Sequence, residues 1–468
     1  MPVTSTVQRP DRVVPDDTGR LERLRAAATR PVNSASVTVF RIAFGVAMMV
    51  NVTLYVPVLV YQYYIDTDVH FPYGPLVFVP VLPGPGIYVV YSGIFVAGAL
   101  IALGKWYRPA VIAVFVLATY VFLLDSTFYQ NHEYLVSMLA FLMIFLPLDG
   151  RWSLDARKHP ERASGTVPAW VLWLLRFQIA IPYVYGGFAK LNGDWLQGEP
   201  LRRWLALRTD IEPINTILTT EAVVWFMAYG ALVLDLLVVA FLLYRPTRLA
   251  AFVIVTSFHL LNVWLFGLFI FPWLMIAATT LFFEPDWPER IARRIPDRMR
   301  PGPLRGVRPS PPPDRASRRL PAALATFLLV WAAVQITVPF RHYAIDGNPS
   351  WTEQAHRFAW HMKLRDKQGT ATMIVTTPDR TFEVDPRDHL GEKQAARVAG
   401  HPDRLAHFAR FLSDLHDGAE VRAETSVSLN GRAPQPIVDP TVDLSEVPRF
   451  EFGRSPWILD LTEPLPRS

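Results

Sequence analysis

A few polar side chains stand inside the long apolar stretches of this 468-residue sequence. His259 and Asn262 are three residues apart in one such stretch, so a helix places them on the same face. Polar side chains are costly inside a membrane helix and are usually functional there. The pair therefore faces either a cavity or a second helix, to which it would hydrogen-bond.

Lys190 follows another apolar stretch, which also contains Gln178. Pro182 and the pair Gly186 and Gly187 interrupt this stretch, as happens in membrane helices where the backbone lines a cavity. An apolar environment favours the neutral amine of a lysine, which can then act as a base. The alternative is an ammonium group that reaches out to the lipid headgroups.

Asn131 and His132 stand together at the start of a further apolar stretch. A histidine in this position can act as a base or donate a hydrogen bond. The alternative is that the two side chains cap the backbone N–H groups of the helix start. Asp235 and Arg41 also lie within apolar stretches, and either can be half of a structural ion pair.

These residues must be positioned by membrane helices, because the apolar stretches have the length of about 20 residues that crosses a bilayer. Two of the predicted spans, 109–124 and 267–283, are short, so eight is the alternative count. The nine predicted spans are 38–60, 86–103, 109–124, 133–149, 168–189, 222–244, 247–265, 267–283 and 321–340.

The charges of the loops predict the orientation of these spans. Residues 61–85 and 125–132 contain no Lys or Arg, whereas the loops on the other side are basic, and 284–320 alone holds ten Arg. Basic loops stay in the cytoplasm, so we expect the N-terminus inside and the C-terminal region outside. Lys190, His132 and the His259 pair then fall at a similar depth near the outer leaflet, which predicts one shared active site.

The predicted fold class is mainly α, a polytopic transmembrane helix bundle with a small C-terminal extracytoplasmic domain that is β-rich or α+β. The C-terminal domain should contain strands at 370–377 and 419–429 and an amphipathic helix at 395–416. The predicted order is a basic cytoplasmic tail (1–37), a catalytic bundle (38–283), a Pro/Arg-rich cytoplasmic linker (284–320), a last span (321–340) and the outer domain (341–468).

Composition agrees with a membrane protein. Hydrophobic residues make up 51% of the chain, and the net charge of +5 is better explained by basic cytoplasmic loops than by nucleic-acid binding. The sequence contains no Cys, which excludes disulfides and thiolate metal sites. The N-terminal residues show no cleavable signal peptide, so the first span is expected to direct membrane insertion.

Several motifs together resemble the vitamin K-dependent gamma-carboxylase family, in particular its bacterial members with a horizontally transferred transmembrane (HTTM) domain. Asn131-His-x-Tyr-Leu135 and Phe258-His-x-x-Asn262-x-x-Leu-Phe266 are similar to family motifs, and they occur in the family's order. The segment from Leu175 to Leu196 resembles the family's Gln-Ile helix that runs into Lys-Leu-Asp-Ala-Asp-Trp. Arg341-His-Tyr and the segment from Arg357 to Arg365 extend the resemblance, which covers roughly residues 35 to 370.

The resemblance implies a carbon–carbon lyase that uses reduced vitamin K or menaquinol, with O2 and CO2 as co-substrates and no metal. Lys190 matches the lysine that deprotonates the quinol, and His132 matches the histidine of the carboxylation step. Asn131, His259, Asn262 and Gln178 then belong to the quinol pocket. The implied partners are the lipid membrane, the quinol and a glutamate-containing peptide, with no nucleic acid.

The sequence also departs from the family pattern. Ala189 precedes Lys190 where animal enzymes have two consecutive lysines, and Asn192-Gly193 replaces Asp-Ala. Two alternatives therefore stay open, namely a quinol epoxidase or oxidoreductase without peptide carboxylation, and a non-enzymatic transporter or scaffold. Transporters often contain paired broken helices in repeated halves, and this sequence shows a single broken helix and no repeat. The Arg-, Ala- and Pro-rich composition suggests a bacterial cytoplasmic membrane.

Overall fold

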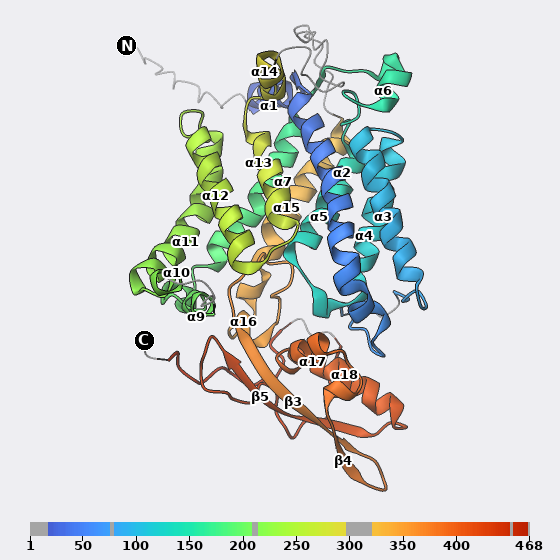
Figure 1. Ribbon diagram of the computed structural model, residues 1–468, viewed down its shortest axis with the longest axis vertical. Helices are drawn as coiled ribbons and strands as arrows, with labels where there is room; N and C mark the ends of the chain where they lie inside the picture. Colours follow the sequence, from blue (N-terminus) through green and yellow to red (C-terminus); the bar gives the residue numbers. More distant parts are fainter. Residues whose placement is uncertain (1–16, 75–78, 208–213, 296–320, 450–452, 467–468) are drawn as a thin grey trace, which may run out of the picture.

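The computed structural model describes residues 17–74, 79–207, 214–295, 321–449 and 453–466. Figure 1 shows a bundle of long helices with a small sheet domain at one end. The apolar side chains buried in the bundle form one large cluster, and those of the sheet domain form a second. The predicted fold class, a polytopic helix bundle with a small C-terminal domain, is confirmed.

Every predicted span corresponds to an apolar helix. Seven described helices are long and apolar enough to cross a membrane, the last of them counted from Ala322 to Ala344, and α5 and α13 are shorter. The helices are α2 (Ala35–Tyr55), α3 (Gly86–Leu103), α4 (Tyr107–Leu124), α5 (Asn131–Phe145), α7 (Ala169–Ala189), α11 (Glu221–Leu243), α12 (Arg248–Phe266), α13 (Phe271–Thr279) and α15 (Ala322–Thr337).

Two spans differ from the prediction for local reasons. The helix predicted at 133–149 ends at Phe145, because Leu146 takes an extended conformation before Pro147, which disfavours a helical residue in front of it. The first span, α2, continues as a π-helical segment, Val56–Ile65, with Pro57 in its first turn. Proline removes one backbone donor, so the regular helix cannot run through this position.

Short elements cover the end of the bundle opposite the sheet domain (Figure 1). The two strands β1 and β2 pair antiparallel, with Val32 opposite Val167. Part of the N-terminal region expected to be a tail is therefore folded against the bundle. These elements are α1 (Asp17–Thr29), β1 (Pro31–Asn33), α6 (Leu154–Lys158), β2 (Thr166–Pro168) and α14 (Trp287–Arg294). Most of the predicted Pro/Arg-rich linker lies outside the described residues.

The C-terminal domain is a three-stranded antiparallel sheet in the order β4-β3-β5, packed against two helices. The expected strands are confirmed as β3 (Lys367–Thr376) and β5 (Glu420–Leu429), and β4 (Thr381–Val384) was not predicted. The prediction of one helix over 395–416 was wrong. Gly400 and Pro402 divide this region into α17 (Glu392–Ala399) and α18 (Pro402–Leu415).

Hydrogen bonds fix the C-terminal domain to the loops at its end of the bundle. The Gln394 amide donates to the Asp125 carboxylate at 3.0 Å, and it is almost fully buried. Arg404 donates to the carbonyl of Ser126 at 2.7 Å, and Arg397 donates to the next carbonyl along the chain. Loops that were predicted to share one side of the membrane therefore do meet at one end of the structure.

Candidate active site

The site begins where α7 and α11 come unusually close. A methyl group at Gly187 would lie 2.7 Å from the Leu236 side chain and 3.0 Å from its backbone nitrogen. A methyl group at Gly186 would lie 3.2 Å from a carboxylate oxygen of Asp235. Only glycine permits such a close approach, so these two residues set the distance between the last turn of α7 and the middle of α11.

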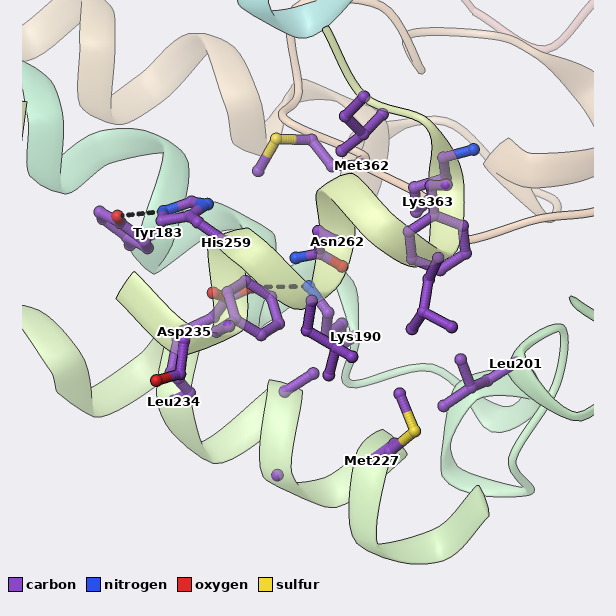
Figure 2. A pocket seen from close by; sticks show the side chains of 18 of the residues that line it. Tyr183, Lys190, Leu201, Met227, Leu234, Asp235, His259, Asn262, Met362 and Lys363 are labelled. Atoms are coloured by element: carbon purple, nitrogen blue, oxygen red, sulfur yellow. Dashed lines mark hydrogen bonds and ion pairs between the residues drawn. The ribbon is translucent and has the colours of Figure 1, made fainter. Parts of the chain in front are cut away.

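Lys190 follows at the end of α7 and forms an ion pair across this contact. Its Nζ lies 2.6 Å from Asp235 Oδ2 and 3.2 Å from the carbonyl oxygen of Gly186 (Figure 2). Both charged side chains are almost fully buried. The Trp195 ring lies 5.3 Å from Nζ, at the end of α8 (Gly193–Leu196), which Asn192 caps. The sequence had suggested an ion pair for Asp235 without identifying its partner.

A cavity of about 330 Å³ opens beside this ion pair. α11 and α12 form most of its wall, together with Tyr183 of α7, Phe271 of α13 and the loop residues Met362 and Lys363. Most of the other lining side chains are apolar. The cavity is therefore mainly apolar with a few polar side chains, which is typical of sites for small organic ligands.

His259 and Asn262 of α12 both line the cavity, as their spacing on one helix face predicted. The Tyr183 hydroxyl lies 2.7 Å from His259 Nε2 (Figure 2). This contact fixes the imidazole ring and leaves Nδ1 as its second polar atom. The amide of Asn262 lies one turn further along α12, on the side toward Lys190 in Figure 2.

His132 does not line the cavity but lies behind one of its walls. The Phe271 ring is 6.0 Å from the His132 ring and 6.1 Å from the His259 ring, measured between centroids. A phenylalanine therefore stands between the two histidines. Of the three polar positions predicted to share one depth, Lys190 and the His259 pair line the cavity, and the Phe271 ring separates His132 from His259.

Asn131 and Gln178 lie away from the cavity and make contacts between segments. The Asn131 amide donates to the carbonyl of His361 at 3.1 Å, which joins α5 to the C-terminal region. The Gln178 amide donates to Gln335 of α15 at 3.2 Å and accepts from the Trp331 indole at 3.0 Å. Asn131 therefore links α5 to the C-terminal region, and Gln178 links α7 to α15, through hydrogen bonds.

The side of the cavity toward the C-terminal domain carries a second lysine that sequence reasoning missed. Lys363 Nζ lies 4.8 Å from the Phe266 ring and 5.5 Å from the Trp204 ring. No acidic side chain among the described residues pairs with it. Burial lowers the pKa of the Lys363 amine, and the positive charge of Arg397 lowers it further. No spacing signal marks this residue in the sequence, because it stands in an irregular loop.

This arrangement can move a proton and hold an anion. The Lys190 and Asp235 pair can exchange a proton between amine and carboxylate, and His259 and Asn262 can hydrogen-bond a ligand oxygen. Within the described ranges, no cluster of three or more His, Asp or Glu side chains is arranged to hold a metal ion.

Comparison with known families matches both parts of the chain. Residues 29–287 match the family model described as HTTM domain. Residues 321–464 match the family model described as vitamin K-dependent gamma-carboxylase, lumenal domain. No solved structure matches the chain. The two matches divide the chain between the helix bundle and the region that begins with α15.

Proposed function

The chain belongs to the gamma-carboxylase family that carries an HTTM domain, and on that premise we propose that it is a quinol-dependent carboxylase. It couples oxidation of reduced vitamin K or menaquinol to its epoxide with carboxylation of glutamate in a peptide. The observation that carries the proposal is the buried pair of Lys190 and Asp235, 2.6 Å apart in the lining of a mainly apolar cavity.

The cavity suits a quinol on chemical grounds. A quinol has a flat apolar ring with a hydroxyl group at each end, and the cavity offers aromatic and aliphatic walls with several polar side chains among them. Tyr183, His259 and Asn262 are neutral hydrogen-bonding side chains, which suit hydroxyl oxygens better than a charged group. When bound, the quinol supplies, through its reaction with oxygen, the base that removes a proton from the glutamate γ carbon.

Lys190 is the base toward the quinol hydroxyl in this proposal. Its ammonium form donates to Asp235, so transfer of that proton to the carboxylate leaves a neutral amine facing the cavity. A buried ion pair is expensive to keep charged, which makes this transfer less costly than it would be in water. The amine then accepts a proton from the ligand hydroxyl, and its position at the end of α7 keeps it there.

The remaining residues have supporting roles in the proposal. His259 is oriented by Tyr183 and binds a quinol oxygen together with Asn262. His132 serves the carboxylation step, for which the Phe271 ring would have to turn aside. Exclusion of water by the apolar walls protects a strong base from being quenched. Gln178 and Asn131 hold the helices and the outer loop around the pocket.

The peptide partner would approach from the side of the C-terminal domain. Lys363 stands there as a cation without an acidic partner among the described residues, and it suits the carboxylate of a glutamate side chain. The basic loops gather at the opposite end of the bundle. We therefore place that end in the cytoplasm of a bacterium and the C-terminal domain outside its cytoplasmic membrane.

The test uses the full-length chain in lipid nanodiscs with reduced vitamin K, oxygen, labelled bicarbonate and a glutamate-containing peptide. Epoxide and fixed label are followed together for the wild type and for Lys190→Ala. The matched control is Lys158→Ala, which changes an exposed lysine at the other end of the bundle.

Epoxide and label that are both lost in Lys190→Ala and kept in Lys158→Ala would support a carboxylase with Lys190 as its base. Epoxide without label would favour a quinol epoxidase or oxidoreductase. If quinone binds and neither product forms, the enzyme proposal is wrong, and a transporter or scaffold becomes the better hypothesis.

A further inference from the structure

The cavity is bounded on one side by two helices that also face the lipid. α11 and α12 contribute Phe226, Ile254 and Leu261 to the cavity lining, and these side chains are 77%, 58% and 39% exposed. Ala228 and Val255, on the same helices, are buried. The wall between the cavity and the membrane is therefore made of side chains that touch both, rather than of a packed layer.

Gly230 lies in this wall and leaves a space. It lines the cavity, and a methyl group added to it would meet no atom within 4 Å. Gly187 is different, because a methyl group there would contact Leu236 at 2.7 Å. Glycine inside a helix costs about 1 kcal/mol relative to alanine. At Gly187 the close packing of α7 on α11 requires glycine and so explains why this cost is accepted. At Gly230 no neighbouring atom requires glycine, so helix packing does not explain the cost there.

The polarity of the cavity changes along its length. Lys190, Asp235 and His259 stand at the inner wall formed with α7, whereas the wall facing the lipid is mostly apolar, with the small polar residue Ser257 in it. A ligand that satisfies both parts has a polar ring at one end and an apolar chain at the other. In a bilayer such a chain does not need to be enclosed by protein, because the lipid solvates it equally well.

We propose that the gap between α11 and α12 at Gly230 is a lateral opening that holds the apolar chain of the quinol. The ring lies at the Lys190 and Asp235 pair, and the isoprenoid chain passes between Gly230 and Ser257 into the bilayer. The inference rests on the proposed function, and it adds the opening through which the ligand enters and the part of the protein that recognises its chain.

The test compares quinols that share one head group and differ in the length of the chain, from none to several isoprene units. Gly230→Phe fills the gap from α11, and Ser257→Phe fills it from α12. Gly230→Ala is the conservative variant, and Val233→Phe is the matched control, since Val233 is an exposed α11 residue that does not line the cavity. Turnover in nanodiscs gives KM and kcat for each quinol.

We expect Gly230→Phe and Ser257→Phe to raise KM for long-chain quinols by about tenfold and to leave KM for the chain-free quinol unchanged. Gly230→Ala should have a smaller effect than Gly230→Phe, and Val233→Phe should behave like the wild type. Equal changes for all quinols, or no change for any, would overturn the lateral opening. Two variants that fill the gap, Gly230→Phe and Ser257→Phe, are used so that the test does not depend on the folding of one variant.

Binding is measured separately from turnover, through quenching of the tryptophan fluorescence of the protein by the oxidised quinones, since Trp195 and Trp204 line the cavity. Loss of preference for the long chain in both filled variants would support the opening even if the protein produced no epoxide. If the wild type turns over the quinol but binds long-chain and chain-free quinones equally well, the lateral opening is rejected and the enzyme proposal stands. The same result, binding that does not depend on chain length, is expected if a phospholipid chain occupies the gap.

Discussion

The carboxylate of Asp194 accepts two hydrogen bonds from the guanidinium of Arg432, each 2.7 Å long. Asp194 lies four residues after Lys190, and Arg432 lies just after β5 of the C-terminal domain. The Asn430 amide donates to the same carboxylate at 2.7 Å. The segment that carries the proposed base is therefore held directly by the C-terminal domain, which couples the position of Lys190 to the docking of that domain.

Replacing Arg432 with alanine should destabilise the protein and lower its activity together. The change leaves the Asp194 carboxylate largely buried without its main partner, which costs about 3 kcal/mol. Thermal unfolding and quinol turnover measure the two effects. Arg422→Ala is the control, because its ion pair with Glu420 is well exposed and should contribute about 0.5 kcal/mol. Equal effects of the two variants would contradict the coupling.

The variant Asp235→Asn should keep the shape of the cavity and bind quinone, but it should lose catalytic turnover. The amide has the shape of the carboxylate but cannot pair with the ammonium that forms when Lys190 accepts the quinol proton, so turnover should fall by about a hundredfold or more. Quinone binding, measured by tryptophan fluorescence, should change little. If turnover survives in Asp235→Asn, the proposed role of Asp235 as the partner of Lys190 is wrong.

A single methyl group at Gly187 should separate α7 from α11. The new group would lie 2.7 Å from Leu236, and overpacking of this kind costs about 1–3 kcal/mol. Turnover should fall as well, because Lys190 moves away from Asp235. Gly193→Ala provides the matched control, since a methyl group there meets nothing within 4 Å. Turnover in Gly187→Ala equal to that of the control would show that the close approach does not position Lys190.

Lys363→Met should weaken binding of the peptide substrate and leave binding of the quinol unchanged. The variant keeps the contact with the Trp204 and Phe266 rings and removes the charge, so KM for a glutamate peptide should rise by about tenfold. KM for the quinol should stay the same. The wild-type KM for the peptide should also rise with salt, and that of the variant should not. A larger effect on the quinol would place Lys363 in the quinol pocket instead.

Stability should fall at mildly acidic pH because of a histidine cluster at the junction. The His361 ring lies 4.7 Å from those of His342 and His356, and its two nitrogens have no hydrogen-bond partner. Burial, helped by the positive charges of His342 and Arg365, lowers the pKa of His361 to about 3.

The unfolded chain takes up this proton near pH 6.5, and the folded chain takes it up near pH 3. The stability that His361 contributes is therefore complete above pH 6.5 and decreases as pH falls toward 3, by about 2 kcal/mol between pH 6.5 and 5. Unfolding midpoints measured across this range should shift less in His361→Leu than in the wild type. His159→Leu, at a half-exposed histidine outside this cluster, should follow the wild type. Identical pH dependence in all three would reject the role of His361.

The helices could be predicted because each one is a local property of the sequence. Apolar length located the seven described helices that are long enough to span a membrane and the two shorter ones, α5 and α13. The break between α17 and α18 was missed because apolar periodicity continues across Gly400 and Pro402. The strand β4 was missed because four residues are too few to show a recognisable alternation of apolar and polar side chains.

The site could be predicted only in part, because its contacts are long-range. The spacing of His259 and Asn262 gave their common face, and the glycines before Lys190 indicated a cavity. The partner of Lys190 is 45 residues away, on a helix whose register against α7 depends on Gly186 and Gly187. Polarity alone also could not separate Gln178, which faces another helix, from residues that face the cavity.

The wall formed by α11 and α12 means that two substrates of the proposed reaction, the quinol and the peptide, are supplied from different phases. The concentration of a lipid-borne quinol is its mole fraction in the membrane, whereas that of a peptide is its molarity in water. Extra phospholipid or detergent would thus dilute the first substrate without changing the second. Rates measured in different membrane mimetics become comparable only when the quinol is expressed per lipid.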